Sequence, residues 1–126
     1  MTRRPESVAR TARWRTELQV SVFLCTGRRI GRRPAHVVVV ERAQRAGLAG
    51  ATAIHGFQGF GRTGTLSHSG ALASDGFEPV LVQLADVPER VQAFLPELQA
   101  LVGDALIVTS TVRVARQPPR TAAAGR

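Results

Sequence analysis

The most constraining feature of this sequence is the order of its apolar patterns. Segments in which every second residue is apolar, the period of a β-strand, alternate with segments that have the three-to-four-residue period of a helix. The order is strand, helix, strand, strand, helix, strand, and all six segments lie between residues 16 and 116. A fold for this chain must therefore pack two helices on a sheet of four strands.

The first strand is the clearest of the six, because Leu18, Val20, Val22 and Leu24 alternate along one face. Turn-forming or polar residues separate the other segments. The expected strands are Leu18–Cys25, Ala51–Phe57, Phe77–Ala85 and Leu106–Arg116, a basic loop is expected over Gly27–Arg33, and the two expected helices run from Pro34 to Gly47 and from Asp86 to Gly103.

Both helices carry end signals. Pro34 suits a first helical turn, and Gly47 is typical of a helix C-terminus. The run of valines before Glu41 could locally form a strand, but Glu41 and Arg45 have the i,i+4 spacing of a helical ion pair. In the second helix, Asp86 is the expected N-cap, with Glu89 at the spacing of a capping box.

The order βαββαβ predicts an α+β, ferredoxin-like fold, a four-stranded antiparallel sheet with two helices on one face. Apolar residues also occur on the second face of the strands, for example Phe23, Cys25 and Leu81. A sheet that is apolar on both faces is normally covered on both faces, so we expect oligomerisation. Pro79 predicts that the third strand begins at a sheet edge or at a bulge.

The positive charge is concentrated outside this core. The formal net charge is +8, of which residues 1–15 carry +4, residues 117–126 carry +2 and residues 16–116 only +2. We therefore expect a domain at 16–116 with flexible tails at 1–15 and 117–126. The tails leave open a non-specific interaction with nucleic acid. The single cysteine and the lack of a signal-like segment favour the cytoplasm.

The long connection between the second and third strands is the strongest candidate for a functional segment. Residues 61–76 form a loop of a length that in compact domains is usually functional or disordered. At its start, Gly59, Gly61 and Gly64 flank Arg62, so backbone N–H groups and a guanidinium can converge on an anion. The spacing alone favours the alternative, in which these glycines serve only as turn residues at the root of a mobile loop.

Catalytic and metal-binding patterns are weak. The three histidines, His36, His55 and His68, lie on different elements and lack the spacing of metal ligands. Ser67 and His68 are adjacent, a poor geometry for nucleophile activation, and no acid–base pair of carboxylates stands out. We therefore expect no catalytic residues, no metal and no enzyme activity, and a small enzyme working in a cleft between subunits remains an alternative.

Three runs of residues resemble a known family. Glu41 to Thr52 contains Gly-Leu-Ala-Gly-Ala-Thr, residues 56–61 read Gly-x-x-Gly-Phe-Gly, and Asp86 to Pro96 reads Asp-x-Pro-Glu-Arg-x-x-x-Phe-Leu-Pro. In this order, and over about residues 16–116, they resemble the PII-like family called domain of unknown function 190. The resemblance implies a homotrimer similar to PII signalling proteins, with nucleotide in the clefts between subunits and a partner bound through the long loop.

The resemblance also implies site residues. Gly59, Gly61 and Arg62 match the start of the PII loop, Gly103 and Asp104 match the turn before its last strand, and Arg113 and Arg116 lie where PII proteins place late basic residues. Thr63 and Gly64 replace the glutamine and lysine that follow in PII proteins, so 2-oxoglutarate is a poor ligand candidate. The chain has no tyrosine, so it cannot be modified on a loop tyrosine.

Together these observations predict a PII-like signalling protein that binds a nucleotide or another small anion and acts on a partner. Because members of the family are often encoded near fluoride-export channels, the resemblance also suggests a membrane transporter or channel as that partner. Nucleic-acid binding through the arginine-rich tails and catalysis in an intersubunit cleft are the alternatives. No cofactor can be named from the sequence.

Overall fold

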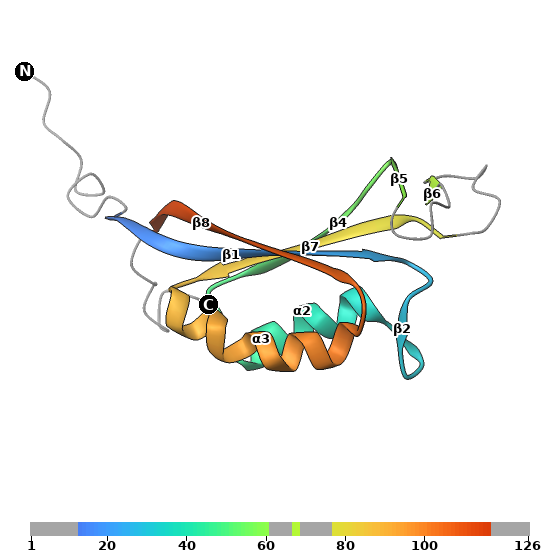
Figure 1. Ribbon diagram of the computed structural model, residues 1–126, viewed down its shortest axis with the longest axis horizontal. Coiled ribbons are helices and arrows are strands. Elements are labelled where there is room, and N and C mark those ends of the chain that lie inside the picture. The colour runs from blue at the N-terminus through green and yellow to red at the C-terminus, as the bar shows by residue number, and fades with distance from the viewer. Residues whose placement is uncertain (1–12, 61–66, 69–76, 117–126) are drawn as a thin grey trace, which may run out of the picture.

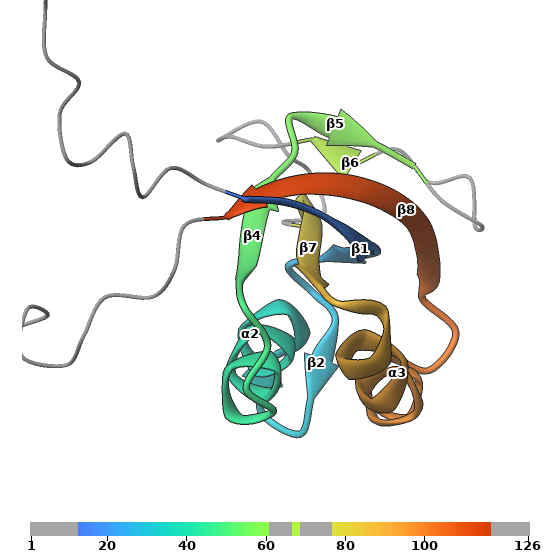
Figure 2. The ribbon, with the colours of Figure 1, turned by 90° about the vertical axis from the view of Figure 1, so that its left-hand side faces the viewer.

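The protein has the expected α+β architecture. The computed structural model describes residues 13–60, 67–68 and 77–116. Four antiparallel strands form one sheet in the order β4-β7-β1-β8: β4 is Ala51–His55, β7 is Pro79–Asp86, β1 is Arg13–Cys25 and β8 is Leu106–Arg116. Helices α2 (Ala35–Arg45) and α3 (Pro88–Val102) lie side by side under one face (Figures 1 and 2).

The core lies between this face and the two helices. As the sequence predicted, every second residue of β1 points toward the helices and is buried: Val20, Val22 and Leu24. In β7 the corresponding buried residues are Val80, Val82 and Leu84. Each helix contributes a buried stripe, which is Ala35, Val38, Val39 and Ala43 in α2 and Val91, Phe94, Leu98 and Val102 in α3. At about 25 cal/mol per Å² of buried apolar area, this layer is the main source of stability.

Helix α2 confirms the helical interpretation of the valine run. Pro34 is its N-cap, so the helix begins at Ala35, one residue after the expected start. The helix ends where Gly47 adopts a positive φ of 80°, and there Leu48 N–H donates to Ala43 C=O at 3.2 Å. Glycine adopts this left-handed conformation at little cost, so the C-terminal signal was correct.

The predicted cap of α3 was wrong. Val87, not Asp86, is the N-cap, and no side chain caps the helix. Asp86 is the last residue of β7, opposite Leu18 of β1, and its carboxylate is buried. The carboxylate accepts hydrogen bonds from the backbone N–H groups of Ala49 and Val87. Asp86 therefore anchors the segment after α2 to the sheet.

The sheet differs from the prediction at two strand starts. β1 begins at Arg13, so residues 13–15, expected in the N-terminal tail, pair with the end of β8. β7 is a central strand, although Pro79 had suggested an edge or a bulge. Proline is tolerated because it is the first residue of the strand, where its carbonyl accepts from Gly56 N–H at 2.7 Å. The rest of both tails, 1–12 and 117–126, lies outside the described residues.

Besides the main sheet, the described residues form two short two-stranded ribbons. The basic loop contains a hairpin of β2 (Arg29–Ile30) and β3 (Arg33–Pro34). After β4, which ends at His55 rather than Phe57, β5 (Gln58–Gly59) pairs with β6 (Ser67–His68). This second ribbon lies on the side of the sheet away from the helices (Figures 1 and 2). Most of the predicted 61–76 loop lies outside the described residues.

A charged cluster closes the end of the sheet where β1 and β8 extend farthest. Glu17 is fully buried, and its carboxylate accepts from Arg116 Nε at 2.7 Å and from Arg15 Nε at 2.6 Å. The Arg116 hydrogen bond, more than any other interaction, lowers the pKa of Glu17. These contacts join β1 to β8. Neither described helix is long and apolar enough to cross a membrane.

Candidate functional site

The face of the sheet opposite the helices carries a row of apolar side chains that crosses all four strands. Ile54 of β4 is opposite Leu81 of β7, which is opposite Phe23 of β1, which is opposite Leu106 of β8. Ile54, Phe23 and Leu106 are 46%, 48% and 60% exposed. The next row contains Thr52, Gln83 and Ser21, so β4, β7 and β1 become polar there, whereas Val108 continues the apolar surface along β8. We call these four residues, Ile54, Leu81, Phe23 and Leu106, the apolar row.

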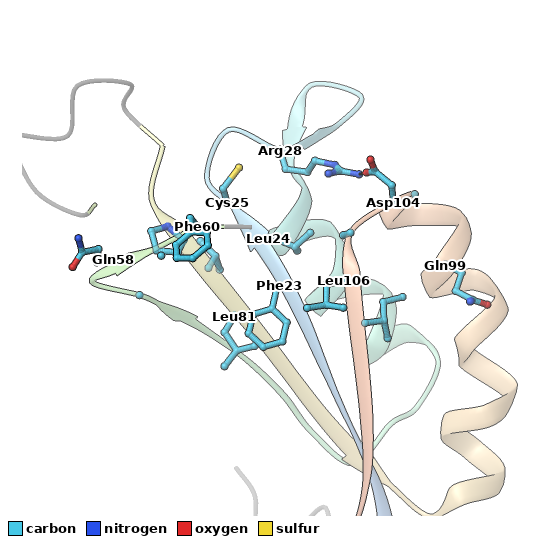
Figure 3. Close-up of a pocket in the computed structure, with 17 residues that line it drawn as sticks. Phe23, Leu24, Cys25, Arg28, Gln58, Phe60, Leu81, Gln99, Asp104 and Leu106 are labelled. Carbon is cyan, nitrogen blue, oxygen red and sulfur yellow. Dashed lines mark hydrogen bonds and ion pairs between the residues drawn. The ribbon is translucent and has the colours of Figure 1, made fainter. Parts of the chain in front are cut away.

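A pocket opens at the same end of the sheet. Its volume is about 1020 Å³, and it lies between the β5 segment and the turn that joins α3 to β8. Phe23, Leu81 and Leu106 of the apolar row line it, and Phe60 closes the side nearest β5 (Figure 3). The pocket and the exposed apolar face therefore form one continuous surface.

The other side of the pocket is polar. Arg28, in the turn after β1, donates from Nη2 to Asp104 Oδ1 at 2.7 Å and to Val102 C=O at 2.6 Å. Figure 3 shows the two side chains meeting at the pocket edge. The carbonyl belongs to the last turn of α3, where a cation is favoured by the helix dipole. Arg28 thus ties the end of α3 to the end of β1.

Three of the predicted site residues meet in this pocket. Gly59, Gly103 and Asp104 all line it, although they come from opposite sides of the pocket. Gly103 has a positive φ of 61°, so the turn itself favours glycine. At Gly59 a Cβ would make only ordinary contact with Pro79, at 3.6 Å, so the fold does not require glycine there. Gly61 and Arg62 lie outside the described residues.

Arg113 and Arg116 are not part of this pocket within one chain. The pocket is at the start of β8, near Leu106, whereas Arg113 is seven residues further on, about 23 Å at the rise of a β-strand. Arg113 is exposed. Arg116 is committed to Glu17 through two hydrogen bonds, at 2.7 and 2.9 Å. Among the described residues that line the pocket, the cation is Arg28. From the sequence, Arg28 was placed in a basic loop and assigned no role.

Two histidines, His36 and His55, lie close together, and His55 contacts Glu78 just before β7. The rings of His36 and His55 are 5.9 Å apart, edge to face, and His55 Nδ1 is 3.0 Å from Glu78 Oε1. Burial, followed by the charge of His55, lowers the pKa of His36, so this ring is neutral near pH 7. Among residues 13–60 and 77–116, no three histidine, cysteine or acidic side chains are placed to hold a metal ion. The side chain of His68 is not described.

Comparison with known proteins identifies related chains. The family model DUF190, described as "Uncharacterized ACR, COG1993", matches residues 17–114. A UPF0166 protein of Aquifex aeolicus (strain VF5) is 30% identical over 67 residues, which are 53% of this chain and 64% of that protein. The match therefore spans somewhat less than two thirds of the relative.

Solved structures share the fold. The structure of CPII from Thiomonas intermedia K12, described as bound to ADP and bicarbonate, has a TM-score of 0.53 at 19% identity and covers 83% of this chain and 94% of that one. A second structure of CPII, described as a nitrogen regulatory PII-like protein bound to ADP, AMP and bicarbonate, has a TM-score of 0.51 at 19% identity, covering 83% and 93%.

Proposed function

Because this chain belongs to the DUF190 family and has a PII-like fold, we propose that it is a non-enzymatic regulatory protein that binds an adenine nucleotide. The observation that carries this proposal is the composition of the pocket. Backbone from Gly59 and Gly103 and one guanidinium, Arg28, face an apolar floor formed by the open side of the sheet. Such a pocket suits a ligand with an anionic end and a flat apolar end.

We further propose that a second copy of the chain completes the site. The apolar row continues from the pocket floor onto exposed sheet surface, and contiguous exposed apolar side chains usually mark an interface. A homotrimer built through this face would enclose the pocket between subunits. The CPII structures, described as bound to ADP, support the choice of nucleotide.

The regulated partner belongs to the same proposal. We propose that it is contacted through the loop of residues 61–76, which follows Phe60 of the pocket lining in the sequence. A membrane transporter or channel in the cytoplasmic membrane, with this protein on its cytoplasmic side, is the partner class we propose. Catalysis is less well supported, because Asp104 is the only carboxylate among the described lining residues and it pairs with Arg28.

Thermal unfolding with and without ligand tests the proposal. A ligand that binds only the folded state stabilises it by about 2.7 kcal/mol at a concentration of 100 times its Kd. For a domain of this size we expect ADP to raise the unfolding midpoint on the order of 10 °C. A midpoint unchanged by millimolar ADP or AMP, but raised by nucleic acid at low salt, would instead favour the nucleic-acid alternative.

A further inference from the structure

Arg28 and Asp104 are the charged side chains among the described residues that line the pocket, and they form an ion pair. Both side chains are partly exposed, at 37% and 58%, and both line the pocket. Exposed ion pairs contribute little to stability, because water and salt screen them. The fold therefore does not depend on this pair, and either partner can be replaced by another group of the same charge.

We propose that Arg28 binds the phosphate of the nucleotide and that Asp104 is an internal competitor that occupies Arg28 while the pocket is empty. This inference rests on the proposed nucleotide function and assigns opposite roles to two neighbouring residues. A phosphate displaces the Asp104 carboxylate from the guanidinium, and the turn that carries Asp104 is released. Binding is thereby coupled to the position of the turn between α3 and β8.

The geometry of Arg28 favours this exchange. Its contacts with Asp104 and with Val102 C=O both use Nη2, and a guanidinium has five N–H donors that match a phosphate bidentately. The acceptor Val102 C=O belongs to the end of α3. The hydrogen bond from Arg28 to this carbonyl can therefore persist, and keep Arg28 in place, while the phosphate replaces the Asp104 carboxylate. Gly103 lets the turn pack this closely, since a Cβ there would lie 3.3 Å from Arg28 Nη2.

The opposite side of the pocket indicates what is attached to the phosphate. Phe60 is 73% exposed, and Phe23 and Leu81 lie next to each other on the floor (Figure 3). A flat ring gains contact there that a free inorganic anion does not. The expected ligand is therefore a phosphate ester of an aromatic base, and free phosphate binds much more weakly.

Four substitutions and two ligands test the proposal. Arg28→Gln and Asp104→Asn change the pocket pair. Arg42→Gln and Glu97→Gln are matched controls, because Arg42 and Glu97 form an ion pair of similar exposure between α2 and α3, away from the pocket. The dissociation constants of ADP and adenosine are measured calorimetrically for each variant, together with the unfolding midpoint.

We expect Arg28→Gln to weaken ADP about tenfold or more, the effect of losing a hydrogen bond to a charged group, and to leave adenosine within about twofold. Asp104→Asn is expected to tighten ADP by about three- to tenfold, since the competing carboxylate is removed. The control variants are expected to bind both ligands as the parent does.

Several results would overturn this inference. Weaker ADP binding by Asp104→Asn would make Asp104 a ligand contact rather than a competitor. An equal loss of ADP and adenosine in Arg28→Gln would assign Arg28 a purely structural role at the end of α3. If Arg28→Gln unfolds, Arg28→Lys is used in its place, because lysine keeps the charge. An unchanged ADP affinity in Asp104→Asn would by itself refute the proposed competition. A parent protein that binds no ADP refutes the proposed function as well.

Discussion

Replacing Phe23 by glutamate is expected to convert an oligomer into a monomer and to abolish stabilisation by ADP. Phe23 stands at the centre of the apolar row, with Leu81 and Leu106 directly opposite on the neighbouring strands. It is 48% exposed in the single chain and points away from the core. The substitution therefore acts on the assembly surface rather than on the packing between sheet and helices.

The expected effect is large because two terms add. Burial of a phenylalanine side chain contributes about 1.5–3 kcal/mol, and burial of an unpaired carboxylate costs several kcal/mol more. Each factor of ten in an equilibrium constant corresponds to about 1.4 kcal/mol, so the dissociation constant of the oligomer should rise by at least about 100-fold.

Light scattering coupled to gel filtration at micromolar concentration measures this result. Gln92→Glu introduces the same charge on the exposed side of α3 and serves as the control. We expect the parent and the control to run as trimers and Phe23→Glu to run as a monomer with an unchanged circular dichroism spectrum. A monomeric parent, or a Phe23→Glu variant of trimer mass, would contradict the proposed interface.

Replacing Glu17 by glutamine is expected to destabilise the fold by about 2–3 kcal/mol without weakening ADP binding. The carboxylate is fully buried and neutralises Arg116 and Arg15. Loss of one partner of a buried pair costs about 3–5 kcal/mol, and we expect less than this here because both arginines are partly exposed. The cluster lies at the end of β8 opposite the pocket, so the ligand should not sense the change.

The pH dependence separates this effect from a loss of packing. The pKa of Glu17 is lowered in the folded state, mainly by its hydrogen bond with Arg116. An acid with a lowered pKa stabilises the fold above its ordinary value of 4.5, and this contribution is lost as the pH falls through the folded-state pKa. The midpoint difference between parent and Glu17→Gln should therefore shrink below pH 4.5.

Thermal unfolding at one protein concentration, from pH 3 to pH 8, is the measurement for Glu17→Gln. Glu41→Gln is the control, because Glu41 accepts two 2.7 Å hydrogen bonds from Arg33 but is solvent-exposed. The control should unfold close to the parent. A Glu17→Gln midpoint equal to that of the parent at pH 7 would show that the buried cluster contributes nothing.

The elements were predictable from local patterns. Side-chain period predicts the alternation at Val20 and Val22 and the last strand over Leu106–Arg116, and backbone preference predicts that α2 ends before Gly47. The structure confirms all three. The exposed apolar face was predictable from Phe23 and Leu81 for the same reason. Such features depend on neighbours within one element.

Pairing across the fold was not predictable in this way. Asp86 has the local features of a helix cap, but its burial beside Ala49 gives its carboxylate other donors. The family resemblance placed Arg116 at the ligand, and nothing in the sequence indicated that it also contacts Glu17, 99 residues away. Arg28 was overlooked for the same reason, since its partners Val102 and Asp104 become neighbours only when β1 pairs with β8.

Calorimetric titration of ADP into the unmodified protein tests the central claim most directly. If the pocket between the β5 segment and the α3–β8 turn is a nucleotide site, ADP should bind saturably with one site per chain. Adenosine and inorganic phosphate, each of which engages only one side of the pocket, should bind more weakly than ADP. The absence of any saturable heat with ADP at millimolar concentration would contradict the account.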